Sequence, residues 1–338
     1  MNQLQFNRKN IQFSGLVADI FAGKHLLNTR DTRSMRTLNS KFQEITGTKF
    51  SYKLPYSLYK KFIDELEWSG MMKFLEHSGK KEISYEANNK IKQIEFTNIC
   101  LLDNQQNDLV ETIHKYPSIS ILKVIKSHDI NLAVFTRLTH LKTLNLIDNG
   151  IESVKHLSHL INLEKLNLSR NQISDITPLK GLVNLRELVL NNNRIINIKS
   201  MEKLVKLEEL HVVYNNLVDI TSLKNLVNLK ELNVGDNILV DITPLEKLVN
   251  LKKLDIRWNK IVDITPLKNL VKLKKLFASR NQISDITPLK GLINITFLDI
   301  GVNSFSDIEP LDGLVNLETI HIGRYKIRDN ARLQAIHL

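Results

Sequence analysis

The side chains able to perform nucleophilic or acid–base chemistry are scattered along this chain of 338 residues. Cys100 is the single cysteine, and His114 and His128 follow it as histidines that could activate it. Buried apolar positions also take cysteine, and we favour that role. The patterns G-x-x-x-x-G-K-[ST], G-x-S-x-G, H-E-x-x-H and G-x-G-x-x-G are all absent from the sequence. We therefore predict that the protein is not an enzyme and needs no cofactor.

Acidic residues recur at a fixed spacing, which could suggest calcium sites. They are Asp175, Asp219, Asp241, Asp263, Asp285 and Asp307. Each is followed by an apolar residue and then by Thr or a near equivalent, so we favour a carboxylate that caps the next turn. His211 and His321 have no neighbouring metal ligand at the same strand position, so we interpret them as contact residues at most. The sequence predicts no metal site.

The elements that position these side chains come from an internal repeat. The phrase L-x-x-L-x-L-x-x-N recurs every 22 residues without insertion. It begins at Leu141, Leu163, Leu185, Leu207, Leu229, Leu251, Leu273 and Ile295, and recurs at Leu317 with Tyr325 in place of the Asn. Ile119, Leu122 and Val124 fit one period earlier, and residues 91–96 make a weaker match. Such a period is typical of a solenoid, with nine clear coils and one or two degenerate ones.

Each position in the repeat has a physical task. Leu166 and Leu168 alternate with polar residues, as in a short strand with one buried face. The Asn that follows each strand can donate to and accept from neighbouring coils, so we predict a structural role for it. The return segment D-I-T-P-L places a proline where it suits the first turn of a 3₁₀ helix.

These residues resemble the leucine-rich repeat family, in its 22-residue class with D-I-T-P-L on the return segment. That class is similar to the repeats of bacterial internalins and of the leucine-rich regulatory subunit of protein phosphatase one. The resemblance covers residues 119–338 well and 91–118 weakly. It implies an α/β fold: a curved solenoid with a parallel sheet on the concave face and 3₁₀ turns on the convex face.

The outward positions of the strands are predicted to bind a protein partner, because they vary between coils while the structural positions do not. Exposed Tyr, Trp, Phe and Arg side chains dominate protein interfaces. Aromatic residues make up 6% of the chain, yet Tyr214, Trp258, Phe277 and Phe297 fall within five consecutive coils, where we place them on solvent-facing strand positions. The predicted contact residues are His211, Val213, Tyr214, Asp255, Arg257, Trp258, Phe277, Arg280, Phe297 and Asp299. Lower on the same face runs a charged row, equally explained by ion pairs between coils: Lys165, Glu187, Glu209, Glu231, Lys253 and Lys275.

Residues 1–90 are predicted to form a small, mainly helical domain before a solenoid of about ten coils at 91–338. Apolar spacing suggests helices at 13–27, 34–45 and 55–76 and a short strand at 83–86. Residues 1–61 hold eleven Lys and Arg and three acidic residues, so most of the net charge of +11 on the whole chain lies in this segment. The leading interpretation is the N-terminal cap that a solenoid requires.

Two alternatives remain for this first domain. Three helices and a strand hairpin are the order of a winged helix, in which Arg30, Arg33, Arg36 and Lys41 would contact nucleic acid. Separately, L-P-x-x-L-x-x-x-F-I-x-x-L at residues 54–66 resembles the opening of an F-box, a motif of ubiquitin-ligase adaptors.

The composition is that of a folded protein. The resemblance to internalin repeats implies a bacterial protein, which we expect to bind a partner in order to regulate, inhibit or recruit it. With one cysteine there is no intramolecular disulfide, and no stretch is apolar enough to span a membrane. The start of the chain lacks the apolar core of a signal peptide. We expect a cytoplasmic monomer, or an effector delivered to a host cell by a specialised secretion system.

Overall fold

The computed structural model describes residues 48–50, 80–85, 91–97, 106–107, 110, 113–114, 119–127 and 130–323. The chain divides into two compact units, Met1–Leu141 and Lys142–Leu338. The predicted helices at 13–27, 34–45 and 55–76 lie outside the described residues. The predicted domain boundary at 90/91 falls just before the strand Ile91–Thr97 and stays a prediction.

The described residues of the first unit include four hydrogen-bonded strands and one 3₁₀ turn. The strands are β1 (Thr48–Phe50), β2 (Lys80–Tyr85), β3 (Ile91–Thr97) and β4 (Ile121–Ile125), and the turn is η1 (Leu132–Arg137). β2 overlaps the strand predicted at 83–86 and runs antiparallel to β3, whereas β1–β2 and β3–β4 are parallel pairs. Ile119, Leu122 and Val124 are fully buried, which confirms the early repeat match around β4.

The second unit is the predicted solenoid. Its strands are β5 (Thr143–Asn145), β6 (Lys165–Asn167), β7 (Glu187–Val189), β8 (Glu209–His211), β9 (Glu231–Asn233), β10 (Lys253–Asp255), β11 (Lys275–Phe277), β12 (Phe297–Asp299) and β13 (Thr319–His321). All pair in parallel, each residue opposite the one 22 positions later, as Lys253 lies opposite Lys275. A constant repeat length produces this constant register, so equivalent residues form columns along the sheet.

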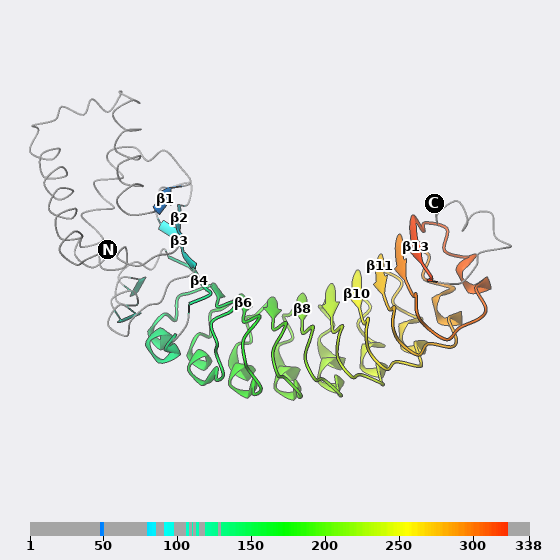
Figure 1. The fold of residues 1–338 in the computed structure, drawn as a ribbon, viewed down its shortest axis with the longest axis horizontal. Helices are drawn as coiled ribbons and strands as arrows, with labels where there is room; N and C mark the ends of the chain where they lie inside the picture. The colour runs from blue at the N-terminus through cyan, green and yellow to red at the C-terminus, as the bar shows by residue number, and fades with distance from the viewer. Residues whose placement is uncertain are drawn as a thin grey trace, which may run out of the picture. The chain divides into compact units, whose positions relative to one another are not determined.

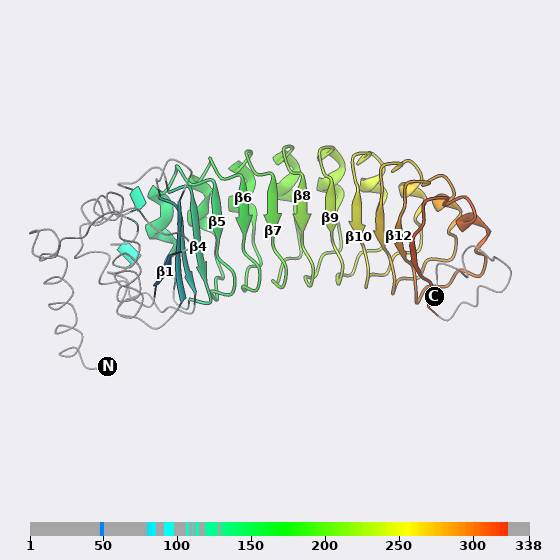
Figure 2. The same ribbon diagram turned by 90° about the horizontal axis from the view of Figure 1, so that it is seen from above.

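Short 3₁₀ turns carry the chain back on the outer side. They are η2 (Lys155–His159), η3 (Thr177–Gly181), η4 (Lys199–Lys203), η5 (Thr221–Asn225), η6 (Thr243–Leu245), η7 (Thr265–Leu267), η8 (Thr287–Leu289) and η9 (Glu309–Leu311). Within this unit the strands line the inner side of an arc and the turns line the outer side (Figure 1), and the strands lie side by side when viewed from above (Figure 2). The leucine-rich repeat prediction is confirmed for these residues.

The core lies between the sheet and the 3₁₀ turns. In the coil of β10, for example, Leu254, Ile256, Ile261, Ile264 and Leu267 are at most 1% exposed. The strand leucines point inward, so the alternate residues of every strand face the concave side.

Candidate functional site

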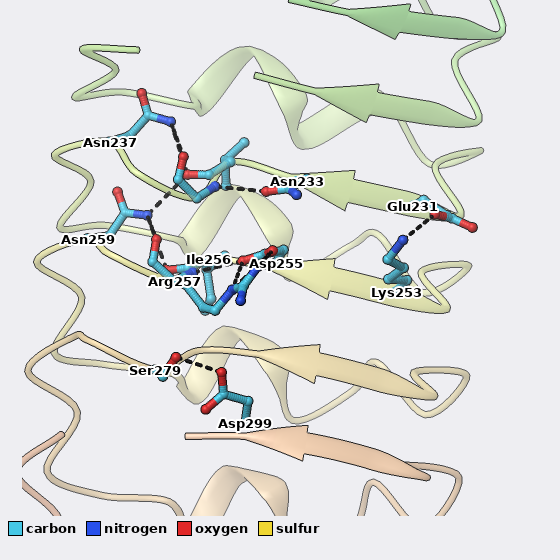
Figure 3. Close-up of polar contacts among 12 residues, drawn as sticks. Glu231, Asn233, Asn237, Lys253, Asp255, Ile256, Arg257, Asn259, Ser279 and Asp299 are labelled. Carbon is cyan, nitrogen blue, oxygen red and sulfur yellow. Dashed lines mark hydrogen bonds and ion pairs between the residues drawn. The ribbon is translucent and has the colours of Figure 1, made fainter. Parts of the chain in front are cut away.

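The asparagine of each coil fixes the end of the strand before it. The Nδ2 of buried Asn237 donates to the carbonyl of Val212 in the preceding coil, at 2.9 Å, and to that of Val234 in its own coil, at 3.1 Å. Its Oδ1 accepts from the Leu217 amide at 2.9 Å. Asn259 repeats this pattern (Figure 3). The predicted structural role of these asparagines is confirmed, since they satisfy buried backbone groups.

The residue before this asparagine adopts the left-handed backbone conformation. Tyr214 and Trp258 both have φ of 53°, and Arg280 has φ of 59°. The Trp258 amide donates to the carbonyl of Ser279 in the next coil at 3.1 Å. The prediction that Tyr214 and Trp258 lie on strands is wrong, because each strand spans three residues and these side chains follow three positions after its end. Both remain accessible, with 58% and 49% of their surface exposed.

Arg280 and Trp258 form a pair within this left-handed column. The Arg280 guanidinium carbon lies 3.9 Å from the centroid of the Trp258 ring, within the range of a cation–π interaction. At an exposed site such a contact is worth about 0.5 to 1 kcal/mol, so it favours one orientation of the indole and reduces the entropy that ordering this side chain would cost.

Phe277 and Phe297 lie on β11 and β12, as predicted, and pack together on the concave face. Their ring centroids are 4.7 Å apart. The His321 ring of β13 meets Phe297 edge-on at 5.4 Å, and the Arg257 guanidinium lies 5.0 Å from the Phe277 centroid. We call Phe277, Phe297 and His321 the aromatic cluster. From the sequence alone, His321 is interpreted as a contact residue at most. His321 is the third residue of its strand, as Phe277 is of β11, so the two side chains occupy the same column of the sheet.

Asp255 and Asp299 also serve the fold. The Asp255 carboxylate accepts from the Arg257 backbone amide at 3.1 Å and receives the Arg257 guanidinium at 2.7 Å (Figure 3). Asp255 is 4% exposed, because its carboxylate is engaged by the Arg257 side chain, and its predicted contact with a partner stays a prediction. The Asp299 carboxylate accepts from the Ser279 hydroxyl at 2.7 Å. Asp255 and Asp299 are the third residues of their strands. At the same position of other strands, Asn145, Asn167 and Asn233 also accept a hydrogen bond from the amide two residues later. This structural role of the position was not predicted from the sequence.

His211 and Val213 are half-buried residues of the coil that contains β8. Burial lowers the pKa of His211, and the nearby Lys253 lowers it further, while the carboxylates Glu231, Glu209 and Glu187 act in the opposite direction. The lowered pKa keeps the imidazole neutral at neutral pH. His211 can therefore offer a partner both a hydrogen-bond donor and an acceptor.

The charged row at the start of the strands contains the ion pairs that the sequence predicted. Lys165 pairs with Glu187 at 2.6 Å, and Lys253 pairs with Glu231 at 3.1 Å (Figure 3). Hydrogen bonding to Glu187 raises the pKa of Lys165. Glu209, which belongs to the same row, forms no ion pair with any residue that the structure describes. Exposed pairs of this kind add little stability each, about 0 to 1 kcal/mol.

The repeated aspartates cap the 3₁₀ turns. Asp219 accepts from the Thr221 amide at 2.7 Å and from its hydroxyl at 2.6 Å, and these bonds lower the pKa of Asp219. The same amide contact recurs at Asp175, Asp241, Asp263, Asp285 and Asp307. The predicted capping role is confirmed, and no group of metal-ligating residues occurs in the part of the chain that the structure describes.

The nucleic-acid contacts predicted for the first domain fall outside the residues that the structure describes. Arg30, Arg33, Arg36 and Lys41 lie outside the described residues, as do Cys100 and His128. Among the residues described, no helix is long and apolar enough to cross a membrane.

Comparison with known proteins agrees with this architecture. The sequence profile of the family "Leucine Rich repeats (2 copies)" matches residues 139–181 and, in overlapping pairs, 183–313, just over half of the chain. No curated protein matches the sequence.

Among solved structures, an internalin (InlF) from Listeria monocytogenes is 27% identical, with a TM-score of 0.66 over 72% of this chain and 71% of its own. Internalin C2 from the same bacterium is 36% identical, with a TM-score of 0.54 over 57% of this chain and 84% of its own. The TLR13–ssRNA13 complex matches at 25% identity, with a TM-score of 0.58 over 69% of this chain and 36% of that one. The 22-residue register, the asparagine column and the family match together show that the chain belongs to the leucine-rich repeat family, with repeats similar to those of bacterial internalins.

Proposed function

We propose that this protein is a non-catalytic protein-binding module whose partner lies across the concave side of β8–β13. The observation that carries the proposal is the accessible aromatic surface of these coils. Tyr214 and Trp258 are half-exposed or more, and the aromatic cluster is ordered by ring contacts. Exposed aromatic and Arg side chains that are already held in place are the usual centres of protein interfaces.

The predicted contact residues divide into two roles under this proposal. Tyr214, Trp258, Arg257 and the aromatic cluster would touch the partner, with Arg280 holding the indole. Asp255 and Asp299 would orient Arg257 and Ser279. Regulation, inhibition and recruitment of the partner would all use this surface. We propose that the protein acts as a monomer in the cytoplasm or after delivery to a host cell.

Affinity capture from a lysate of the native cell tests the binding surface. The variant Tyr214→Asn/Trp258→Asn removes both rings and keeps a residue that tolerates the left-handed backbone, as Asn192 does natively at φ of 55°. A matched control is Val218→Ala/Val262→Ala, in the same coils, with side chains 58% and 46% exposed on the return segment. A protein lost with the aromatic variant and retained by the control supports the proposal. Equal capture by wild type and both variants contradicts it.

A nucleic-acid regulator is the second candidate function. It is favoured by the eleven basic residues within positions 1–61. The alternatives differ in salt dependence, because contacts to phosphate weaken steeply as salt rises whereas an aromatic interface does not. Capture of nucleic acid alone, lost above about 200 mM salt, would favour this second candidate.

A further inference from the structure

The charge of the concave sheet reverses sign between β9 and β10. The first residues of β7, β8 and β9 are Glu187, Glu209 and Glu231, which lie opposite one another in the parallel register. The residues preceding them, Arg186, Glu208 and Lys230, pair with one another through Glu208. The three glutamates form an acidic row whose ends are paired, Glu187 with Lys165 of β6 and Glu231 with Lys253 of β10, while Glu209 in the middle has no ion pair among the described residues.

The next two strands begin with four lysines. Lys252 and Lys253 precede and start β10, and Lys274 and Lys275 do the same for β11, with Lys253 directly opposite Lys275. Lys253 pairs with Glu231, but in the described part of the chain the other three ammonium groups meet no carboxylate. Like charges placed opposite each other destabilise a sheet, so the fold gains nothing from Lys275 opposite Lys253.

The aromatic cluster begins directly after the lysines. Phe297, the first residue of β12, lies opposite Lys275, and Phe277 and His321 flank it on the neighbouring strands. One line across β7–β12 therefore presents acid, then base, then an aromatic surface. At about 4.8 Å between strands, this line is about 24 Å long.

We propose that the concave sheet binds an extended protein segment that carries basic, then acidic, then apolar side chains along one face. This inference rests on the proposed protein-binding function and adds the chemistry of the partner. A uniform polyanion such as nucleic acid would meet the acidic row, and a uniform polycation would meet the four lysines. Only a chain whose own charge reverses at the same place is attracted along its whole length.

The spacing fixes the pattern of the segment. Alternate residues of an extended chain lie on one face about 6.8 Å apart, so five of them span about 27 Å. Two basic residues would then cover the acidic row, two acidic residues would cover β10 and β11, and an apolar residue would reach Phe297. The predicted pattern is basic-x-basic-x-acidic-x-acidic-x-apolar, read in either chain direction.

Synthetic peptides with blocked ends test this order by isothermal titration with the full chain at about 50 mM salt. The probes are Arg-Ser-Arg-Ser-Glu-Ser-Glu-Ser-Leu and Glu-Ser-Glu-Ser-Arg-Ser-Arg-Ser-Leu, each also in reversed direction. Their compositions and net charges are identical. We expect the first order, in one direction, to bind at least about tenfold more tightly, from four exposed charge pairs acting together.

Two triple variants locate the effect. Lys252→Glu/Lys274→Glu/Lys275→Glu removes the basic part of the line and should abolish the preference for order. The control makes the same charge change on the return segments, at the exposed lysines Lys224, Lys247 and Lys268, and should keep the preference.

Three results would overturn the inference: equal affinity for both charge orders, no detectable binding at 1 mM peptide, or tighter binding of a ten-residue polyglutamate than of any mixed peptide. Capture that depends on Tyr214 and Trp258, found together with any of these, would leave the proposed function standing while rejecting this charge order. Failure of both experiments would reject the concave surface itself.

Discussion

The substitution Asn215→Ala should cost far more stability than Asn216→Ala, although the two residues are neighbours. Asn215 is 9% exposed, and its Nδ2 donates to the carbonyls of Leu190 and Val213 at 3.0 and 3.1 Å. Its Oδ1 accepts from the amide of fully buried Ile195 at 2.9 Å. The Asn216 side chain is exposed. The same residue type at adjacent positions thus separates the asparagine column from the surface.

The magnitude follows from what each lost bond leaves behind. After truncation the Leu190 carbonyl keeps the Asn193 side chain as a donor, and the Val213 carbonyl keeps the Asn192 amide. The Ile195 amide loses its acceptor in a buried position. One orphaned buried donor costs about 1 to 3 kcal/mol, and two weakened carbonyl contacts add to it, so we expect about 2 to 3 kcal/mol.

Urea unfolding of the full chain, followed by circular dichroism, measures this difference. The expected change for Asn216→Ala is within about 0.5 kcal/mol, as at other exposed positions. A solenoid can unfold in parts, so the slopes of the transitions must agree before the midpoints are compared. If the two variants unfold at the same urea concentration, the asparagine column does not hold the coils together and the reasoning is wrong.

Four further predictions concern the same coils. Gly235→Ala places a Cβ 3.2 Å from a buried carboxylate oxygen and should cost about 1 to 2 kcal/mol in urea unfolding, whereas at Gly181, with nothing within 4 Å, the same change should cost nothing. Asp219→Ala should lower unfolding free energy by about 1 kcal/mol at pH 7, and less below pH 3.8, because the lowered pKa of this carboxylate stabilises the fold only while it is ionised. The folded pKa of His211 lies below 6.5, so its contribution is present above pH 6.5 and lost as pH falls; His211→Gln should show a smaller drop in Tm between pH 7.5 and pH 5 than wild type. Val302→Asn should raise Tm, because a β-branched residue at φ of 55° is strained.

The repeat made most of the solenoid predictable. A fixed 22-residue period with buried leucines leaves one parallel register, and the structure has it at every pairing from β5 to β13. The asparagine column and the aspartate caps follow from the same logic, since a polar residue at a fixed place beside buried backbone must satisfy it.

The exact positions of the surface side chains were less predictable. The alternation of polar and apolar residues suggests that the strands continue to Tyr214 and Trp258. The strands end earlier, because the backbone at these residues turns into the left-handed region, where its amide donates to a carbonyl of the next coil. Burial of Asp255 depends on Gly235 in the preceding coil, whose missing Cβ leaves room for the carboxylate. Such dependence between coils does not appear in the pattern of one repeat.

The left-handed column gives separate support to the proposed contact surface. Its conformation favours Asn, Asp or Gly, and Asp148, Asn192 and Asp236 conform. Tyr214, Trp258 and Val302 occupy the same conformation at a cost of about 1 kcal/mol or more each. Their side chains are exposed and add nothing to the core that would offset this cost. Strain that the fold does not need is expected at functional positions, so the two aromatic departures, Tyr214 and Trp258, support the proposed contact surface, whereas Lys126 and Arg170 depart from the same rule outside it.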